Sequence, residues 1–267
     1  MSDLIPTNHT FAVCAYKENP FLEQCVRSVV LQDEKTNVII CTPTPNDHIK
    51  EIAARYDLPV FVNPDSQADM QGSWNFAMKT VQTDYVTICH QDDYYAPDYY
   101  STVKHYLSDD LLYLHTNYKN AFTDAEGNTE IKTSKNIHFK RVIHFFFNSR
   151  WQQDKVFFKK WDLRFGNSVC CPTCTYNKTN LTLPLFTSDL RHAIDWVVYI
   201  KLASQKGRVV YVRKPVAFKR IHSEAQTKDD VISGVRAKED IEMYSLLWPR
   251  FFAKLLQKIL VLFYNAG

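Results

Sequence analysis

The alternation of two hydrophobic periods along residues 10–89 constrains the fold more than any other feature. Short apolar runs suited to buried strands lie at 10–15, 38–41, 59–62 and 85–89. Between them, apolar residues recur at helical spacing in the segments 21–29, 49–56 and 74–81. Asn19 and Pro20 predict the start of the first helix, as its N-cap and first helical residue. Repeated strand–helix units predict an α/β fold, with a mainly parallel central sheet flanked by helices.

The second half of the chain is less regular. We expect a strand at 111–115, a turn at 124–128, a loop at 166–183, a helix at 188–204 that Gly207 ends, and a strand at 208–212. The sequence shows no internal repeat and no low-complexity tract.

Composition narrows the function classes. With 45% hydrophobic and 23% charged residues, the chain of 267 residues reads as an ordinary globular protein. Its net charge of +3 is too small to indicate a nucleic-acid partner. We expect no signal peptide and no spanning helix, since no uncharged apolar run reaches about 18 residues. The odd number of cysteines, seven, favours reduced thiols and a cytoplasmic protein over a disulfide framework.

Two adjacent carboxylates, Asp92 and Asp93, directly follow the predicted strand at 85–89. Ligands of parallel sheets bind outside the carboxyl ends of the strands. Two like charges at that place repel each other unless a cation lies between them, and Mg²⁺ or Mn²⁺ commonly binds carboxylates together with substrate phosphates. The pair therefore indicates a metal that holds a phosphorylated ligand. The alternative is a solvated turn ahead of a helix that Pro97 and Asp98 open.

Two later features bear on the same chemistry. Asp195 interrupts an otherwise apolar helix, where a charge needs either a functional role or a salt-bridge partner. Arg220 and His222 alternate along an extended run and should share one face of it. His222 then suits a third metal ligand or a phosphate contact, although a lone histidine is usually neither.

In order and spacing, these pieces resemble the family 2 glycosyltransferases of the GT-A fold. The resemblance rests on FAVCAYKENPFLEQCVRSVVLQD near the start, on Asn63, Gly72 and Asn75, on the HQDD motif, on Asp195 and on the R-x-H of Arg220 and His222. It covers roughly residues 10 to 228. The sequence departs from the family pattern at TPTPND after the second strand, at His90 in place of the first acid, and at Ile194 before the base.

The resemblance implies an inverting transfer of sugar from a nucleotide-diphospho-sugar, which we expect to be UDP-linked, with Mn²⁺ or Mg²⁺ as cofactor. It implies donor contacts by Ala15, Tyr16, Glu18, Thr42, Asn75, Asp92 and Arg220, and metal binding by Asp93 and His222. Asp195 would be the catalytic base, with Trp196 and Cys174 on the acceptor side. Residues 1–228 would form the GT-A domain, divided into a donor half (1–115) and an acceptor half (116–228), and 229–267 a C-terminal helical extension.

The C-terminal extension carries an apolar stripe, formed by Phe252, Leu255, Leu256, Ile259 and Phe263, beside Arg250, Lys254 and Lys258. Such a helix suits the surface of an anionic membrane, at the inner face of which an enzyme of surface polysaccharide or glycolipid synthesis would meet a saccharide or lipid-linked acceptor. The alternatives are docking of the stripe on the core, or on a second subunit in a homodimer.

Other functions are disfavoured by particular residues. Zinc is weakly indicated by Cys170, Cys171 and Cys174, because no second pair of ligands has matching spacing. The absence of G-x-G-x-x-G and Walker A patterns argues against dehydrogenases and P-loop NTPases. A metal-dependent nucleotidyltransferase remains an alternative, although CAYKENP lacks the glycines of its usual loop. A non-catalytic GT-A-like binding protein is the other alternative, and it would have no reason to keep Asp93, Asp195 and His222 together.

Overall fold

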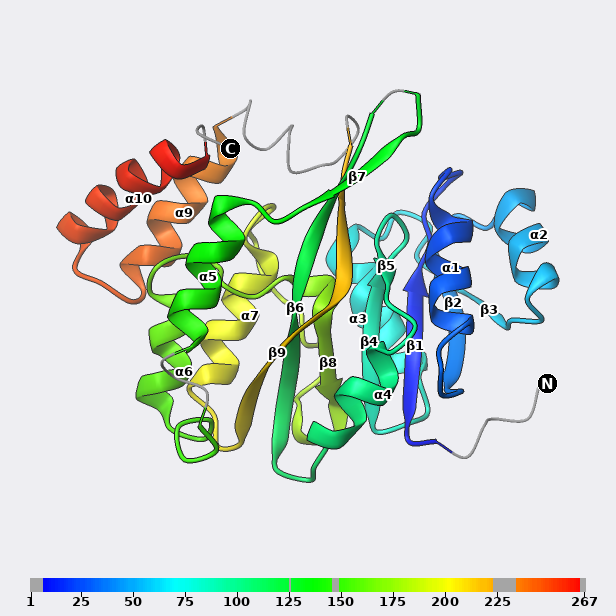
Figure 1. The fold of residues 1–267 in the computed structure, drawn as a ribbon, viewed down its shortest axis with the longest axis horizontal. Coiled ribbons are helices and arrows are strands. Elements are labelled where there is room, and N and C mark those ends of the chain that lie inside the picture. The colour runs from blue at the N-terminus through cyan, green and yellow to red at the C-terminus, as the bar shows by residue number, and fades with distance from the viewer. Residues whose placement is uncertain (1–6, 125, 146–148, 223–233, 265–267) are drawn as a thin grey trace.

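The protein is described by a computed structural model over residues 7–124, 126–145, 149–222 and 234–264. Its strands are β1 (His9–Cys14), β2 (Asn37–Thr42), β3 (Val60–Val62), β4 (Tyr85–His90), β5 (Tyr94–Tyr95), β6 (Leu111–Thr123), β7 (Thr129–Lys132), β8 (Cys174–Asn177) and β9 (Arg208–Ile221). Its helices are α1 (Leu22–Val30), α2 (Asp47–Arg55), α3 (Met70–Thr80), α4 (Tyr99–Val103), α5 (Lys135–Phe145), α6 (Val156–Leu163), α7 (Ile194–Ala203), α9 (Val235–Ser245) and α10 (Arg250–Tyr264). Figure 1 shows α1 and α2 near one end of the sheet, and α5, α6, α7, α9 and α10 gathered beyond the long strands β6 and β9.

The strands form one sheet in the order β3-β2-β1-β4-β8-β6-β9-β5, and β7 pairs with β6. The first four strands of this order are parallel, as the alternating periods predicted, and β6 runs parallel to β9. Strand β8 is antiparallel to both β4 and β6. The α/β prediction is confirmed, and the sheet is mixed because β8 enters between its two parallel parts.

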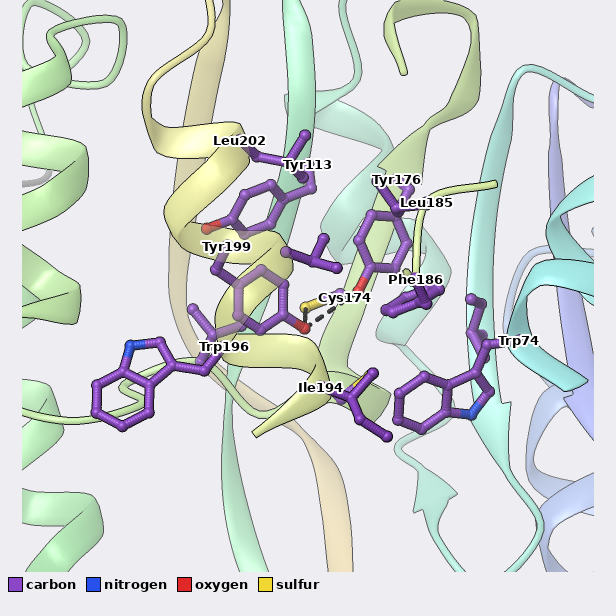
Figure 2. Packing of buried hydrophobic residues seen from close by; sticks show 14 of the residues in the cluster. Trp74, Tyr113, Cys174, Tyr176, Leu185, Phe186, Ile194, Trp196, Tyr199 and Leu202 are labelled. Carbon is purple, nitrogen blue, oxygen red and sulfur yellow. Dashed lines mark hydrogen bonds between the residues drawn. The ribbon is translucent and has the colours of Figure 1, made fainter. Parts of the chain in front are cut away.

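The prediction of a loop over residues 166–183 is wrong for residues 171–177. Residues 171–173 form a 3-10 turn, and β8 follows as a fully buried strand in the centre of the sheet. Figure 2 shows why this short strand is stable there: Tyr176 and Cys174 of β8 meet Tyr199 of α7. The Tyr199 hydroxyl lies 3.1 Å from that of Tyr176 and 3.3 Å from the Cys174 sulfur.

Each face of the sheet is covered by its own helices. Along β1, Phe11 and Val13 face the core under α1, α2 and α4, whereas Ala12 faces the core shared with α3 and α7. This alternation is what a strand buried on both faces requires. The second core also includes Met243 and Tyr244 of α9, so the C-terminal segment shares it.

Two predicted helix starts move by several residues. α1 begins at Leu22 because the Asn19 side chain accepts a hydrogen bond from the Phe21 backbone N–H instead of capping a helix at Pro20. α7 begins at Ile194, not at 188. The chain after α7 turns at Gly207, whose φ of +123° and 2.8 Å clearance to Leu112 leave no room for a side chain.

The seven cysteines carry free thiols. Within the described residues, no helix has both the length and the hydropathy to cross a membrane.

Candidate active site

A cleft of about 1180 Å³ opens where β1 and β4 end and where the last residues of β9 pass. Its walls come from the start of α3, the turn after β4, the segment 167–172, the start of α7 and α9. The carboxyl ends of the parallel strands therefore border a large cleft, as the topology of an α/β sheet leads one to expect.

The turn after β4 brings three potential metal ligands together. Ligand atoms of His90, Asp92 and Asp93 all lie within 4.8 Å of one another. Asp93 is 5% exposed, and its Oδ1 accepts a hydrogen bond of 2.8 Å from the Arg220 backbone N–H. The predicted partner His222 lies 3.2 Å from Asp92, Nε2 to Oδ2. The close group of potential ligands therefore contains the predicted Asp92 and Asp93 with His90, whereas the predicted ligand His222 contacts Asp92 from outside this group.

The chemistry of this set fits a divalent cation. Burial lowers the pKa of His90 to about 4, so that its imidazole is neutral at physiological pH and can offer a lone pair. The Nε2 atom of His90 is buried and has no hydrogen-bond partner among the described residues. Two carboxylates with one imidazole suit Mn²⁺ better than Mg²⁺, which prefers oxygen ligands alone.

The local electrostatics shift the pKa values of the two carboxylates in opposite directions. Burial, together with the charge of Asp92, raises the pKa of Asp93 well above its ordinary value. Burial also acts to raise the pKa of Asp92, but the His222 hydrogen bond and the neighbouring His90 outweigh it and lower that pKa. Of the two carboxylates, Asp93 is therefore the one that takes up a proton more readily.

Arg220 lines the cleft, but its guanidinium group donates to the protein. Nε donates to the Asp92 carbonyl at 2.9 Å, Nη1 to the Thr123 hydroxyl at 2.6 Å, and Nη2 to the Gln24 side chain. The group also stacks over Phe21, 4.2 Å from the ring centroid. Arg220 thus holds the turn after β4 through the Asp92 carbonyl, and its implied contact with the donor stays a prediction.

The other predicted donor residues divide into two groups. Ala15 and Tyr16 line the cleft, and the backbone of Tyr16 is held by the Gln91 side chain, which accepts from its N–H at 2.8 Å and donates to its carbonyl at 3.1 Å. Glu18 is exposed outside the cleft lining. Thr42 is fully buried, and its hydroxyl accepts a hydrogen bond from the Thr44 N–H. Neither Glu18 nor Thr42 reaches the cleft.

Asn75 also has a structural environment. Its amide donates to the Phe186 carbonyl and accepts from the N–H groups of Leu185 and Phe186. These three hydrogen bonds fasten the segment 185–186 to α3, and Asn75 is not among the cleft residues. The structure thus gives the side chain a role in the scaffold, where the resemblance had implied a donor contact.

The predicted base, Asp195, lines the same cleft. Asp195 is in the first turn of α7, where its Oδ1 accepts from the Trp196 N–H at 2.8 Å. Burial raises the pKa of Asp195 above its ordinary value. Trp196 lines the cleft beside it and packs against Tyr244. Cys174 does not fit the acceptor side, because it is fully buried under Tyr199 (Figure 2).

Glu239 of α9 fixes the start of α7. Its buried carboxylate accepts hydrogen bonds from the N–H groups of Arg191, His192 and Ala193, at 2.8, 2.8 and 2.9 Å. These N–H groups precede the first turn of the helix, where a negative charge is favourable. A side chain of the C-terminal segment thereby positions the turn that carries Asp195.

Sequence reasoning missed several residues of the site, namely His90, Lys140, Lys219, Glu239, Arg236 and Asp240. His90 stands in the HQDD motif, where the resemblance gives it no role because it replaces the first acid of the family pattern. Lys219 directly precedes Arg220, so its position next to a functional strand was a usable signal. Lys140, Arg236 and Asp240 belong to no motif, and the fold alone brings them to the cleft.

Comparison with solved structures shows the same fold. The Pyrobaculum calidifontis mannosyltransferase PcManGT, in complex with GDP-Man and Mn²⁺, is 14% identical, with a TM-score of 0.63 over 99% of this chain and 79% of that one. The S. aureus protein TarS 1-349, in complex with UDP-GlcNAc, is 15% identical, with a TM-score of 0.61 over 88% and 66%. Glucosyl-3-phosphoglycerate synthase from Mycobacterium tuberculosis, in complex with Mn²⁺ and UDP-Glc, is 12% identical, with a TM-score of 0.54 over 87% and 76%. The predicted GT-A-type fold is thereby confirmed.

This chain spans only part of the length of the TarS structures. The chain spans 64% of another TarS 1-349 structure and 39% of the longer TarS chain. No curated protein matches the sequence. The model of the family described as Glycosyl transferase family 2 matches residues 10–178, which is more than half of the chain. The chain belongs to glycosyl transferase family 2.

Proposed function

We propose that this protein transfers a sugar from a nucleotide-diphospho-sugar, UDP-linked in our expectation, to a hydroxyl group of a saccharide or lipid-linked acceptor, with inversion at the anomeric carbon. One observation carries the proposal: the metal-binding set of His90, Asp92 and Asp93 and the carboxylate of Asp195 lie on the walls of a single cleft. The structural neighbours that hold UDP-GlcNAc, UDP-Glc or GDP-Man support a nucleotide-sugar donor.

The residues of the cleft suit the two requirements of the reaction. A divalent ion bound by His90, Asp92 and Asp93 would stabilise the negative charge of the leaving diphosphate. Asp195, whose pKa burial raises, would accept the proton of the attacking hydroxyl. A single base opposite the leaving group favours direct displacement, and direct displacement inverts the anomeric carbon.

The donor site is tested by calorimetric titration of UDP, with GDP for comparison, in the presence and absence of Mn²⁺. We expect UDP to bind only with the metal, and Asp93→Ala to abolish binding. Asp47→Ala is the matched control, because it removes an exposed carboxylate of α2 away from the cleft. The proposal fails if no nucleotide binds under any condition, or if Asp93→Ala binds UDP as the unmodified protein does. The first result would favour a non-catalytic binding protein.

We further propose that α10 contacts an anionic membrane surface on the cytoplasmic side, where a lipid-linked acceptor for surface polysaccharide or glycolipid would lie. Phe251, Phe252, Leu255 and Ile259 of α10 are exposed, beside the exposed cations Arg250, Lys254 and Lys258. Leu256 of the predicted stripe is half-buried against the core, and the side chain of Phe263 lies outside the described residues.

The apolar surface extends beyond α10. A continuous series of ring contacts, each between 5.3 and 6.4 Å centroid to centroid, joins Trp151, Phe158, Phe157, Trp161, Phe165, Trp248, Phe252 and Phe251. Trp151 and Phe157 are also exposed. Aromatic rings beside basic side chains are characteristic of surfaces that rest in the lipid headgroup region.

Sedimentation with lipid vesicles tests this surface. We expect binding to vesicles that contain phosphatidylglycerol, little binding to pure phosphatidylcholine, and a marked loss in Phe251→Ser. Val62→Ser on β3 removes an exposed apolar side chain elsewhere and serves as the control. Equal binding by all three proteins would contradict membrane contact, and concentration-dependent dimerisation that Phe251→Ser abolishes would assign the surface to a homodimer instead.

A further inference from the structure

Three cationic side chains from separate elements line the cleft near Asp195. Lys140 comes from α5, Lys219 from β9 and Arg236 from α9. Their charges act on one another: Lys219 and Arg236 both act to lower the pKa of Lys140, and Arg236 acts to lower that of Lys219. The fold therefore concentrates positive charge at one place, far along the sequence from the metal-binding turn.

The two lysines have no salt bridge within the described residues. Lys140 Nζ makes only a 3.4 Å contact to the Tyr118 hydroxyl and lies 5.8 Å from the centre of its ring. Burial lowers the pKa of Lys140 to about 8. Arg236 has a carboxylate neighbour in Asp240, at 3.9 Å. A buried cation such as Lys140, which has no paired carboxylate within hydrogen-bond distance, is unfavourable in the free protein, and an anionic ligand would relieve that cost.

The nearby carboxylates have other roles in the proposed reaction. Cys170, Asp93 and Asp195 act to raise the pKa of Lys219 against the effect of burial, and we assign the two carboxylates to the metal and to the proton transfer. Lys140 is also influenced by Asp195. The cationic cluster thus adjoins the base, where the acceptor must present its hydroxyl. The donor diphosphate belongs beside His90, Asp92 and Asp93, and Lys219 also acts on the first and last of these, so the probes must distinguish the two anions.

We propose that Lys140, Lys219 and Arg236 form an anion-binding subsite beside Asp195, and that the acceptor carries a phosphate or carboxylate group close to the hydroxyl that is glycosylated. This inference rests on the proposed glycosyltransferase function, whose acceptor it specifies. Hydrogen-bond donors of Asn120 and Ser134 on the same wall suit the remaining oxygens of such a group.

The test uses the full chain loaded with UDP and Mn²⁺, so that the donor diphosphate site is already filled. Glycerol 3-phosphate and glycerol are the probes, since both offer hydroxyl groups and only the first carries the anion. We expect glycerol 3-phosphate to bind at least about tenfold more tightly than glycerol, and Lys140→Met to remove most of that difference. Lys135→Met removes an exposed charge from the same helix, outside the cleft, and should leave both affinities unchanged.

Several results would overturn the inference. Equal binding of the two probes, or a preference that Lys140→Met leaves intact, would show that the cluster does not recognise the anion. Binding of glycerol 3-phosphate only in the absence of UDP would assign the lysines to the donor diphosphate. If UDP does not bind in the presence of Mn²⁺, the glycosyltransferase proposal itself is contradicted, and the acceptor subsite that rests on it is contradicted as well. If UDP binds and the probe preference is absent, the glycosyltransferase proposal survives without this acceptor class.

Discussion

Replacing Asp93 by asparagine should have opposite effects on the metal-free and the metal-bound protein. Ligand atoms of Asp92 and Asp93 lie no more than 4.8 Å apart, so at an effective dielectric constant of about 20 two carboxylates there repel each other by at least about 3.5 kcal/mol. The neighbouring cations Lys219 and Arg220, together with proton uptake by Asp93, offset most of this repulsion. We therefore expect Asp93→Asn to increase the free energy of unfolding in EDTA at neutral pH by on the order of 1 kcal/mol. In a chain of this size, that change raises Tm by about 2–4 °C.

The stability difference between the unmodified protein and Asp93→Asn should depend on pH in one direction. Because the pKa of Asp93 is raised in the folded protein, the folded state binds more protons than the unfolded state above pH 3.8. The unmodified protein therefore loses stability as pH rises from that value through the raised pKa, and Asp93→Asn should not show this loss. The advantage of the variant should grow with pH.

Addition of Mn²⁺ and UDP should reverse the ranking. Ligands that bind only the folded state raise its stability by about 2.7 kcal/mol at a hundred times their Kd. The unmodified protein should gain this stabilisation, and Asp93→Asn should not. Thermal unfolding in EDTA and in Mn²⁺ with UDP measures both effects, and Asp47→Asn is the control. A variant that is no more stable than the unmodified protein in EDTA, or that gains equally from Mn²⁺ and UDP, would refute the electrostatic reasoning.

Three further substitutions separate catalysis from structure. Asp195→Asn should lower kcat by about 10²–10⁴-fold without changing UDP affinity. In the unmodified enzyme, the rate should fall as pH falls through the raised pKa of Asp195, because the base must be unprotonated. A rate that is independent of pH between 4 and 8 would argue against this role. Glu239→Gln weakens the acceptor of three backbone N–H groups, so it should lower the free energy of unfolding by about 2 kcal/mol and also reduce kcat. Chemical denaturation and steady-state kinetics measure the two effects. An unchanged unfolding midpoint would contradict the capping role. Asn75→Ala should destabilise the protein by about 2 kcal/mol and leave UDP affinity intact, whereas a selective loss of UDP affinity would restore Asn75 to the donor site.

The sequence predicted those parts of the molecule that depend on local patterns. The parallel strands and their helices follow from hydrophobic period, and the Asp92–Asp93 pair follows from its place after a buried strand. Strand β8 could not be recognised, because four residues after an irregular stretch have no period of their own. It is specified by long-range packing of Cys174 and Tyr176 against α7.

The same distinction applies to the site. The metal-binding turn and Asp195 stand out locally, as charges in apolar surroundings. The hydrogen bonds of the Arg220 guanidinium group could not be predicted from the sequence, because its partners Gln24 and Thr123 lie far away in the chain, on α1 and β6. Lys140 and Arg236 are ordinary basic residues of polar helices, and only the assembled fold directs them to a common cleft.

The register of β9 decides which cation serves which side of the cleft. Consecutive residues of a strand point to opposite faces, so Lys219, on whose pKa Cys170, Asp93 and Asp195 act, points away from Arg220, whose Nε donates to the carbonyl of Asp92. Between residues 212 and 217 the pairing of β9 with β6 shifts twice. Loss or gain of one residue in that interval would exchange the two faces, placing the arginine near the base and the lysine under the metal-binding turn. Length changes there should therefore abolish function even where the strand still forms, which makes this short irregularity less tolerant of insertion than the surface loops around it.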